Sequence, residues 1–197
     1  MIELTLIRHG KTKANLEHRY CGVTDESLCS KGIMEIEKAA AEGRFNNCDA
    51  LFVSPKLRCR QTAEIIYPDT VQGEIEELQE IDFGIFEGKT YQELSGTKDY
   101  QDWIKSGGTL AFPEGESRDA FIERVLEGFG KLVDAVSKLT GKENKRISAV
   151  VHGGTIMALC FGLNGGDYFD YQVNCGEGYK LILDDNGKLI KEPERIC

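Results

Sequence analysis

Two histidines in this 197-residue chain stand where an apolar run stops abruptly. His9 follows "TLIR", His152 follows "ISAVV", and a glycine comes directly after each histidine. Arg8 precedes the first histidine, and an arginine side chain keeps its charge at any physiological pH. A guanidinium beside an imidazole at the end of a strand predicts a pocket that binds an oxyanion.

A second arginine and a set of acids extend the candidate chemistry. Arg58 lies in the first turn after the apolar run "ALFVS", so we expect it at the same edge, whereas Arg60 is expected to point to solvent. A carboxyl group among apolar neighbours has a raised pKa, which suits proton transfer. The spacing alone does not choose among the four acids of "ELQEIDFGIFEG", which are Glu77, Glu80, Asp82 and Glu87.

These groups need strands that end at one edge of a sheet. Hydrophobic patterns predict strands over 2–7, 50–54 and 147–151, the last two buried on both faces. Helices are predicted over 30–43, 56–66, 90–105 with a break near Gly96, and 117–139 with Ser117 as N-cap. Residues 71–88 are expected to be irregular, and the chain is expected to close with a hairpin that turns at Asn186-Gly187.

Strands that alternate with helices predict an α/β fold, a three-layer sandwich with a mostly parallel central sheet flanked by helices. Ligands bind such sheets beyond the carboxyl ends of the strands, so neighbouring strands would bring His9 and His152 to one crevice. A helix starting at about Thr155 would present N–H groups that favour an anion. His18, beside Arg19 in a polar stretch, is expected to be an ordinary surface residue.

Composition limits the possible partners. The formal net charge of −9 disfavours nucleic acid, although a small anion can bind where positive charge is concentrated. No apolar stretch approaches the roughly 20 residues of a membrane span, and the N-terminus lacks the features of a signal peptide. Seven cysteines without a C-x-x-C pair are typical of free thiols in a reducing compartment. We expect a single domain over 1–197, in the cytoplasm and without membrane association.

Five segments, in order, resemble the histidine phosphatase superfamily, in the branch that includes cofactor-dependent phosphoglycerate mutases. They are "LIRHGKTKAN", "SPKLRCRQTA", "LQEIDFGIFEG", "GES" and "VVHGGTIMAL", and they span most of the chain. The first resembles the RHG-x-T-x-x-N signature of that family. The second departs from S-P-L-x-R-A-x-Q-T-A at Lys56 and Cys59 but keeps the arginine.

The resemblance implies a role for each matching residue. His9 would be the nucleophile that becomes phosphorylated, and Glu80 would donate and accept the proton, which resolves the choice among the four acids. The phosphate pocket would be formed by Arg8, Arg58 and His152. The substrate side would be lined by Asn15, Cys21, Gly22 and Gly153. The resemblance implies no metal ion and no other cofactor.

The family contains both hydrolases and mutases. Its mutases tend to carry extra sequence after the acid segment, whereas only about 35 residues separate Glu80 from Gly115, so we favour a phosphomonoesterase for a small phosphorylated metabolite. Trp103 in a compact middle region, and the late segment "YQVNCGEGYKLI", resemble the bacterial α-ribazole-phosphate phosphatases of cobalamin biosynthesis. The alternatives are mutase-type phosphoryl transfer and a broad-specificity sugar phosphatase.

Two readings from other classes are weaker. A metal hydrolase would use the three histidines and an acid as ligands, but the arginine beside His9 would repel a cation. A non-catalytic module that binds phosphoproteins is disfavoured because all five expected catalytic positions are filled.

Overall fold

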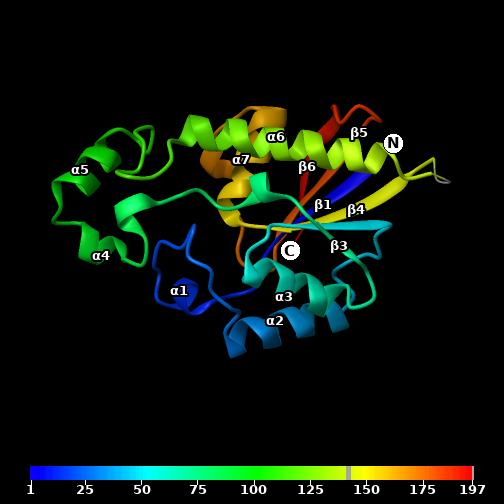
Figure 1. The fold of residues 1–197 in the computed structure, drawn as a ribbon, viewed down its shortest axis with the longest axis horizontal. Coiled ribbons are helices and arrows are strands. Elements are labelled where there is room, and N and C mark those ends of the chain that lie inside the picture. Colours follow the sequence, from blue (N-terminus) through cyan, green and yellow to red (C-terminus); the bar gives the residue numbers. More distant parts are fainter. Residues whose placement is uncertain (141–142, 197) are drawn as a thin grey trace.

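The computed structural model describes residues 1–140 and 143–196, so Cys197, the last of the seven cysteines, lies outside the described residues. A six-stranded sheet lies between layers of helix (Figure 1). In chain order, with η for a 3-10 helix, the elements are β1 (Ile2–Arg8), α1 (Lys13–Leu16), α2 (Ser30–Ala41), β2 (Ala50–Val53), α3 (Leu57–Ile66), β3 (Gln72–Glu74), η1 (Glu76–Leu78), η2 (Gly84–Phe86), α4 (Tyr91–Leu94), α5 (Lys98–Lys105), α6 (Arg118–Ser137), β4 (Lys145–Val151), α7 (Gly153–Asn164), η3 (Tyr168–Tyr171), β5 (Gly178–Leu183) and β6 (Leu189–Ile196).

The strand order in the sheet is β3-β2-β4-β1-β5-β6. The first four strands of that order run parallel, β5 runs antiparallel to β1, and β6 runs antiparallel to β5. The predicted α/β fold with a mostly parallel sheet is therefore confirmed. β1 and β4 are neighbours, and their register pairs Arg8 with Val151. The next residues, His9 and His152, consequently leave the sheet side by side, where such sheets bind ligands.

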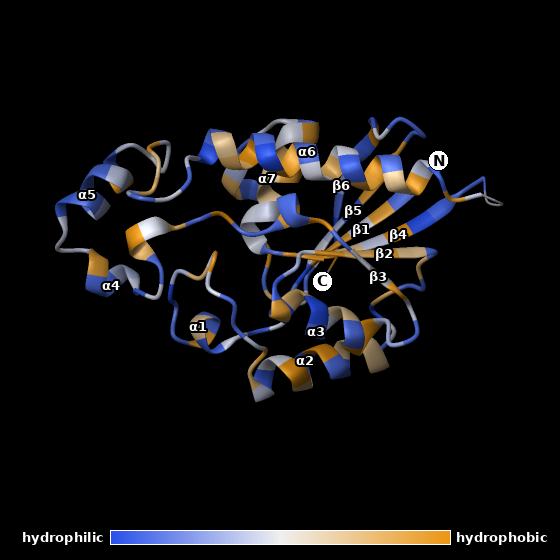
Figure 2. Ribbon diagram, viewed as in Figure 1, coloured by the Kyte–Doolittle hydropathy of each residue, from blue (hydrophilic) through white to orange (hydrophobic). Residues whose placement is uncertain are grey.

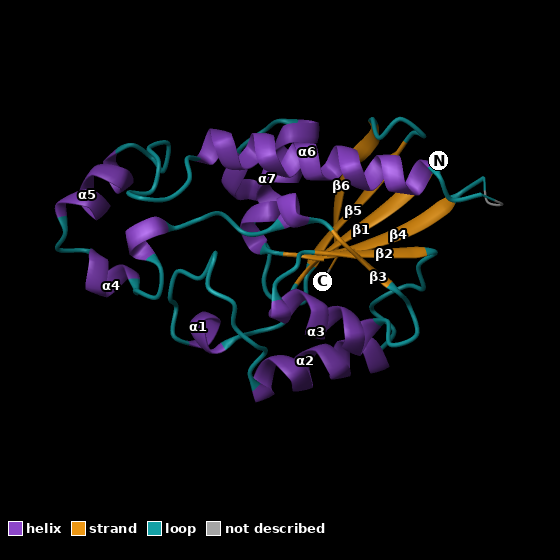
Figure 3. Ribbon diagram, in the orientation of Figure 1, coloured by secondary structure: helices purple, strands orange, loops and turns teal. Residues whose placement is uncertain are grey.

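Helices cover both faces of the sheet, with α6 and α7 on one side and α2 and α3 on the other (Figures 1 and 3). α6 buries the apolar stripe that its sequence predicts, including Phe121, Val125, Phe129, Leu132 and Val136. The central strands β1, β2 and β4 carry apolar runs, whereas β6 is largely hydrophilic (Figure 2). β4, at the centre of the sheet, is buried on both faces from Ile147 to Val151, as expected.

The prediction that the strand over 50–54 is buried on both faces was wrong for β2. Leu51 and Val53 are buried and pack with Cys59 and Ala63 of α3, whereas the residues between them are only partly covered. The strand lies next to the short edge strand β3, which leaves its second face less shielded than that of a central strand.

Three further boundaries differ from the predictions. The segment 71–88 is mostly irregular but contains β3, which pairs with β2 although its sequence Gln-Gly-Glu has no apolar residue. α2 begins at Ser30, as predicted, with Cys29 as its N-cap, whose sulfur accepts from the Gly32 N–H, but the helix ends at Ala41, before the predicted end at 43. α7 begins at Gly153, less than one helical turn before Thr155, so the N–H groups of two glycines form its N-terminus.

The other boundaries agree with the sequence. Ser117 caps α6, the break near Gly96 separates α4 from α5, and β5 and β6 form the expected hairpin, with Gly187 at a φ of 81°. The short helix α1 has no counterpart among the predictions. A capping box formed by Thr12 and Asn15 starts it.

A small cap built from α1, α4 and α5 lies beyond the carboxyl ends of β1 and β4 (Figure 1). Its own core is aromatic: the Trp103 and Phe112 rings stack with centroids 4.9 Å apart, and Phe86 meets both edge-on. Within 1–140 and 143–196, no helix combines the length and the apolar character that crossing a bilayer requires.

Candidate active site

His9 stands at the end of β1 with one ring nitrogen fixed by the backbone. Its Nδ1 lies 2.7 Å from the carbonyl oxygen of Gly10, and the side chain is buried. A carbonyl can only accept, so Nδ1 carries the hydrogen and Nε2 keeps its lone pair. The ring of His152 meets the ring of His9 edge-on, with centroids 5.2 Å apart.

The environment of His9 disfavours its charged form. Burial is the largest cause of a pKa well below the usual histidine value, and the positive charges of Arg58 and Arg8 lower it further. The imidazole is therefore neutral at physiological pH. A neutral imidazole with a defined free lone pair can act as a nucleophile.

Arg58 enters the site from the first turn of α3 and is 1% exposed. Its Nη1 and Nη2 donate to the carbonyls of Thr24 (2.8 Å) and Gly22 (2.9 Å), and its Nε lies 3.3 Å from Nδ1 of His152. A guanidinium held by three protein acceptors keeps one orientation and still has two N–H bonds to offer.

Glu87 holds the loop that positions Arg58. Its carboxylate accepts from the N–H groups of Gly22 (2.8 Å) and Val23 (3.1 Å) and from the Thr24 hydroxyl (2.8 Å). This residue is one of the four acids that the sequence leaves open, and its carboxylate is occupied by that loop. The Gly22 position also has no room for a side chain, because a Cβ would lie 1.9 Å from the carbonyl oxygen of Ile81.

His152 is fully buried behind Arg58, and both of its ring nitrogens have protein partners. Because the Arg58 Nε can only donate, Nδ1 of His152 accepts, and Nε2 donates to the Ser54 hydroxyl at 2.7 Å. Burial, followed by the charge of Arg58, lowers the pKa of His152 well below the usual value. In this arrangement His152 orients Arg58 and packs against His9.

Arg8 is the least restrained of the cationic groups. Its Nη1 donates to the carbonyl of Val173 at 2.6 Å, while its buried Nε has no hydrogen-bond partner among the described residues. A Cβ at Gly153 would lie 3.2 Å from the guanidinium carbon, so the glycine lets Arg8 lie against the start of α7. A buried donor without a partner is suited to an incoming oxyanion.

Glu80 is the acid that the structure brings to this site. Its carboxylate accepts from the Gly154 N–H at the start of α7 and from its own neighbour, the Ile81 N–H, both at 3.0 Å. Burial nevertheless raises the pKa of Glu80, against the lowering influence of these two N–H groups and of Arg8 and Arg58. A carboxyl group with a raised pKa can hold a proton for transfer to a leaving group.

The other two acids have structural partners. Glu77 pairs with Lys131 of α6, and Asp82 accepts from the Gly84 N–H at 2.8 Å. Arg60 pairs with Glu74 at the surface, as expected for a residue that points to solvent.

Two adjoining cavities open in front of these groups. The first has a volume of about 240 Å³ and is also bordered by the exposed His18. Five predicted site residues line it, namely Arg8, His9, Asn15, Cys21 and Glu80. The second, of about 350 Å³, shares Arg8 and Glu80 with the first and includes Gly153. Neither cavity is bordered by Arg58, His152 or Gly22, which lie one layer behind.

The second cavity has a chemical character that the sequence does not reveal. It is lined by six aromatic side chains from the cap and from η3, together with Arg118: Tyr20, Phe83, Trp103, Phe112, Tyr168 and Phe169. These residues are spread over 150 positions of the chain and follow no motif. Only their convergence in the fold makes them a lining.

The described residues contain no group of three or more His, Cys, Asp or Glu side chains that could hold a metal ion. The metal-hydrolase reading therefore has no ligand set in 1–140 and 143–196.

Comparison with known proteins identifies the family of this chain. Residues 4–192 match the Histidine phosphatase superfamily (branch 1). The chain is 31% identical to the "Uncharacterized phosphatase PhoE" of Bacillus subtilis (strain 168) over 85% of its length and 80% of that protein. It is 29% identical to the "Adenosylcobalamin/alpha-ribazole phosphatase" of Salmonella typhimurium over 98% of its length and all of that protein.

Among solved structures, the fold is similar to a phosphoserine phosphatase variant of Entamoeba histolytica in complex with phosphoserine. The TM-score is 0.81 at 28% identity, over the whole of this chain and 96% of the other. Because the family match covers nearly the entire chain, this protein belongs to branch 1 of the histidine phosphatase superfamily.

Proposed function

We propose that this protein is a phosphomonoesterase that hydrolyses a small phosphorylated metabolite through a phosphohistidine on His9. The observation that carries the proposal is the hydrogen bond from Nδ1 of His9 to the Gly10 carbonyl. It leaves a neutral imidazole with its Nε2 lone pair free, beside two arginines that attract a phosphate group. No metal ion takes part in the proposed steps.

In the first step, Nε2 of His9 attacks phosphorus and the bond from phosphorus to the ester oxygen breaks. Glu80 gives its proton to the departing alcohol oxygen, so a neutral alcohol leaves. Arg8 and Arg58 stabilise the negative charge that spreads over the phosphoryl oxygens.

In the second step, water attacks the phosphohistidine and the bond from nitrogen to phosphorus breaks. The Glu80 carboxylate takes one proton from the water, which restores its acid form. The products are the alcohol and inorganic phosphate, and both His9 and Glu80 return to their starting states.

The aromatic cavity supports a substrate with a planar, largely apolar leaving group. Rings such as Trp103, Phe112 and Tyr168 stack well on a flat heterocycle, and a volume of about 350 Å³ is in the usual range for a small-molecule site. We therefore infer α-ribazole 5′-phosphate as the candidate substrate. The full-length similarity to the Salmonella phosphatase supports the same choice.

Phosphoserine is a second candidate, because of the structural similarity to the Entamoeba enzyme. Its short, charged leaving group would leave most of the aromatic cavity unfilled. Sugar phosphates would bring hydroxyl groups to the same apolar walls, which offer few partners for them. Both should therefore be poorer substrates than a phosphorylated benzimidazole riboside.

We propose hydrolysis in preference to mutase-type transfer. The chain between Glu80 and α6 forms only the short helices η2, α4 and α5, and the 240 Å³ cavity beside His9 is bordered by exposed residues such as His18. Water can thus reach the phosphohistidine before a second substrate replaces the first.

The test combines a trapping experiment with a substrate panel. Enzyme quenched rapidly during turnover should carry an acid-labile phosphoryl group, mapped by mass spectrometry to His9. The values of kcat/KM should be highest for α-ribazole 5′-phosphate and lower for phosphoserine, 3-phosphoglycerate and glucose 6-phosphate. Equal, slow turnover of all four would remove the substrate proposal, and an unmodified His9 during rapid turnover would remove the mechanism.

A further inference from the structure

The backbone around Glu80 belongs to neither a helix nor a strand. Glu80 follows the single turn η1 and precedes η2, so the carbonyl groups of Glu77, Gln79 and Glu80 have no partner in a regular hydrogen-bond ladder. A segment of this kind keeps its shape only if other parts of the protein bind its backbone.

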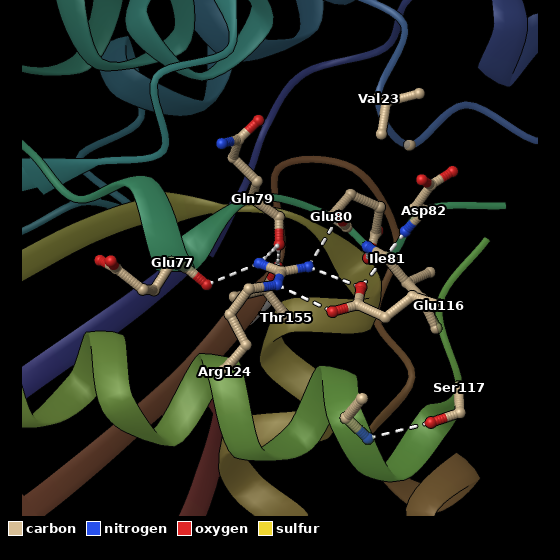
Figure 4. Close-up of polar contacts among 12 residues, drawn as sticks. Val23, Glu77, Gln79, Glu80, Ile81, Asp82, Glu116, Ser117, Arg124 and Thr155 are labelled. Carbon is tan, nitrogen blue, oxygen red and sulfur yellow. Dashed lines mark hydrogen bonds and ion pairs between the residues drawn. The ribbon is translucent and has the colours of Figure 1, made fainter. Parts of the chain in front are cut away.

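Arg124, in the second turn of α6, binds all three of these carbonyl groups (Figure 4). Its Nη1 donates to Glu77 O (2.8 Å) and Gln79 O (3.2 Å), and its Nη2 donates to Glu80 O (3.2 Å). The remaining two donors, one on Nε and one on Nη2, go to the Glu116 carboxylate at 2.9 and 2.7 Å. A guanidinium has five N–H donors, and here each has an acceptor.

Glu116 holds the same segment from its other side. Its carboxylate accepts from the Asp82 N–H at 3.4 Å, and its own N–H donates to the Asp82 carbonyl at 2.9 Å. The pair therefore fixes the peptide groups on both sides of Glu80. Glu116 is the middle residue of the "GES" segment, whose chemical purpose the nucleophile and the phosphate pocket do not explain.

The base of this arrangement is rigid. The Ser117 hydroxyl caps α6 one residue after Glu116, and the fully buried Phe121 anchors the first turns, with the Arg124 guanidinium carbon 5.1 Å from its ring centre. Hydrogen bonds from one arginine on a long, well-packed helix thus restrain the backbone of an irregular loop.

We propose that Arg124 and Glu116 are positioning residues for proton transfer: they hold the Glu80 backbone so that its carboxyl group stays against the leaving-group oxygen. The inference rests on the proposed role of Glu80 as proton donor. A displacement of about 1 Å at a reacting group can lower a rate by about 100-fold, so the backbone anchor has a direct kinetic consequence. Lysine cannot replace Arg124, since its three donors on one nitrogen cannot reach acceptors on opposite sides.

The test is the leaving-group dependence of kcat/KM, which reports the first step alone. Arg124→Ala and Arg124→Lys should lower kcat/KM by about 30-fold for alkyl phosphates, whose oxygen needs a proton to leave. For 2,4-dinitrophenyl phosphate, whose leaving group needs none, the loss should be less than about threefold. The inhibition constant of inorganic phosphate should stay within about twofold of wild type, because Arg8 and Arg58 are untouched. Glu116→Gln should show the same pattern with a smaller loss.

A matched control lies on the same helix. Lys131 binds the Glu77 side chain and not the backbone near Glu80, so Lys131→Met should keep wild-type rates on both esters. Because the Arg124 side chain borders a cavity of about 580 Å³ beside Glu80, added guanidinium should restore part of the alkyl phosphatase activity of Arg124→Ala but not alter that of Lys131→Met.

Running Glu80→Gln in parallel separates two kinds of failure. If Glu80→Gln shows no dependence on the leaving group, the acid assignment itself is wrong. If Glu80→Gln shows it but folded Arg124 variants lose equal activity on both esters, or lose none, the positioning role is overturned. Circular dichroism identifies the folded variants, and the lysine variant serves where alanine unfolds the protein.

Discussion

The two halves of the proposed active site are built by different means. The phosphate half, with His9 and His152, stands at the ends of two central strands whose register is set by backbone hydrogen bonds. The acid half, with Glu80, lies in an irregular segment held by side chains that bind backbone groups. A phosphoryl group requires several donors at fixed places, whereas one proton donor requires only a well-placed carboxyl group.

The difference has a physical origin. A strand inside a sheet cannot shift without breaking bonds on both sides, so its end is a precise mount for a nucleophile. An irregular loop has no such constraint and relies on individual residues such as Arg124 and Glu87. We therefore expect substitutions in the phosphate half to abolish turnover of every ester. Substitutions of the loop anchors should instead impair either proton transfer or phosphate binding, and not both.

The largest effect is expected at the nucleophile. His9→Ala should lower kcat by about 1,000-fold or more, because the substitution removes the imidazole nitrogen that is proposed to attack phosphorus. The decrease should be similar for alkyl and aryl esters. Steady-state assays on both types measure it, and retention of more than a tenth of wild-type activity would contradict the role of His9.

Glu80→Gln should give the next largest effect and one that depends on the ester. The amide cannot release a proton, so kcat/KM should fall by about 100-fold for alkyl phosphates and far less for dinitrophenyl phosphate. A loss of the same size for both esters would place Glu80 in the phosphate half and not in the acid half.

The next substitution, Glu87→Gln, changes the residue that holds the loop beside Arg58, and it should weaken phosphate binding. The neutral amide binds the N–H groups of loop 22–24 less strongly than the carboxylate does, and the carbonyls of this loop orient Arg58, so the inhibition constant of inorganic phosphate should rise by about tenfold. The ester dependence should stay as in the wild type. Glu64→Gln, an exposed substitution on α3, is the control, and an unchanged phosphate constant in Glu87→Gln would disprove the connection.

The smallest expected effect is a change in the free energy of unfolding with pH. The pKa values of His9 and His152 are lowered in the folded protein, mainly by burial. Below the unfolded-state value of about 6.5, only the unfolded chain takes up these protons, so the free energy of unfolding should fall as pH decreases. Each histidine should contribute about 1 kcal/mol of that decrease between pH 7 and pH 5.5.

Urea unfolding at the two pH values measures the contribution. His9→Asn should lose about half of the histidine-linked pH dependence. Equal pH dependence in wild type and His9→Asn would show that His9 is not buried as a neutral group.

Sequence patterns predicted the sheet and helices well where one element buries an apolar run. β4 and α6 agree with their predictions, because periodicity reports burial directly. β3 was missed because its residues carry no such signal, and the two-sided burial of β2 was overestimated because a short apolar run does not reveal how near it lies to the sheet edge.

The proposed catalytic groups divide along the same line. His9, Arg8 and Arg58 could be proposed from sequence because each lies at or just after the end of a strand that must meet the ligand edge. Spacing alone could not choose among four acids, since the choice depends on which carboxylate reaches the Gly154 N–H at the start of α7. Resemblance to a family selected Glu80, and in the fold its carboxylate accepts from the Gly154 N–H.

The sequence by itself determined the class of fold and the cationic, imidazole-bearing strand ends, because local patterns of apolar residues decide where strands stop. Tertiary structure alone decided which nitrogen of His9 is free, how the aromatic side chains of the cap form one cavity, and how Arg124 of a distant helix reaches the backbone of Glu80. The last two features depend on side chains that meet across long stretches of chain, and no spacing within the sequence encodes such meetings, whereas His9 bonds its neighbour Gly10 and the folded site sets the orientation of its ring.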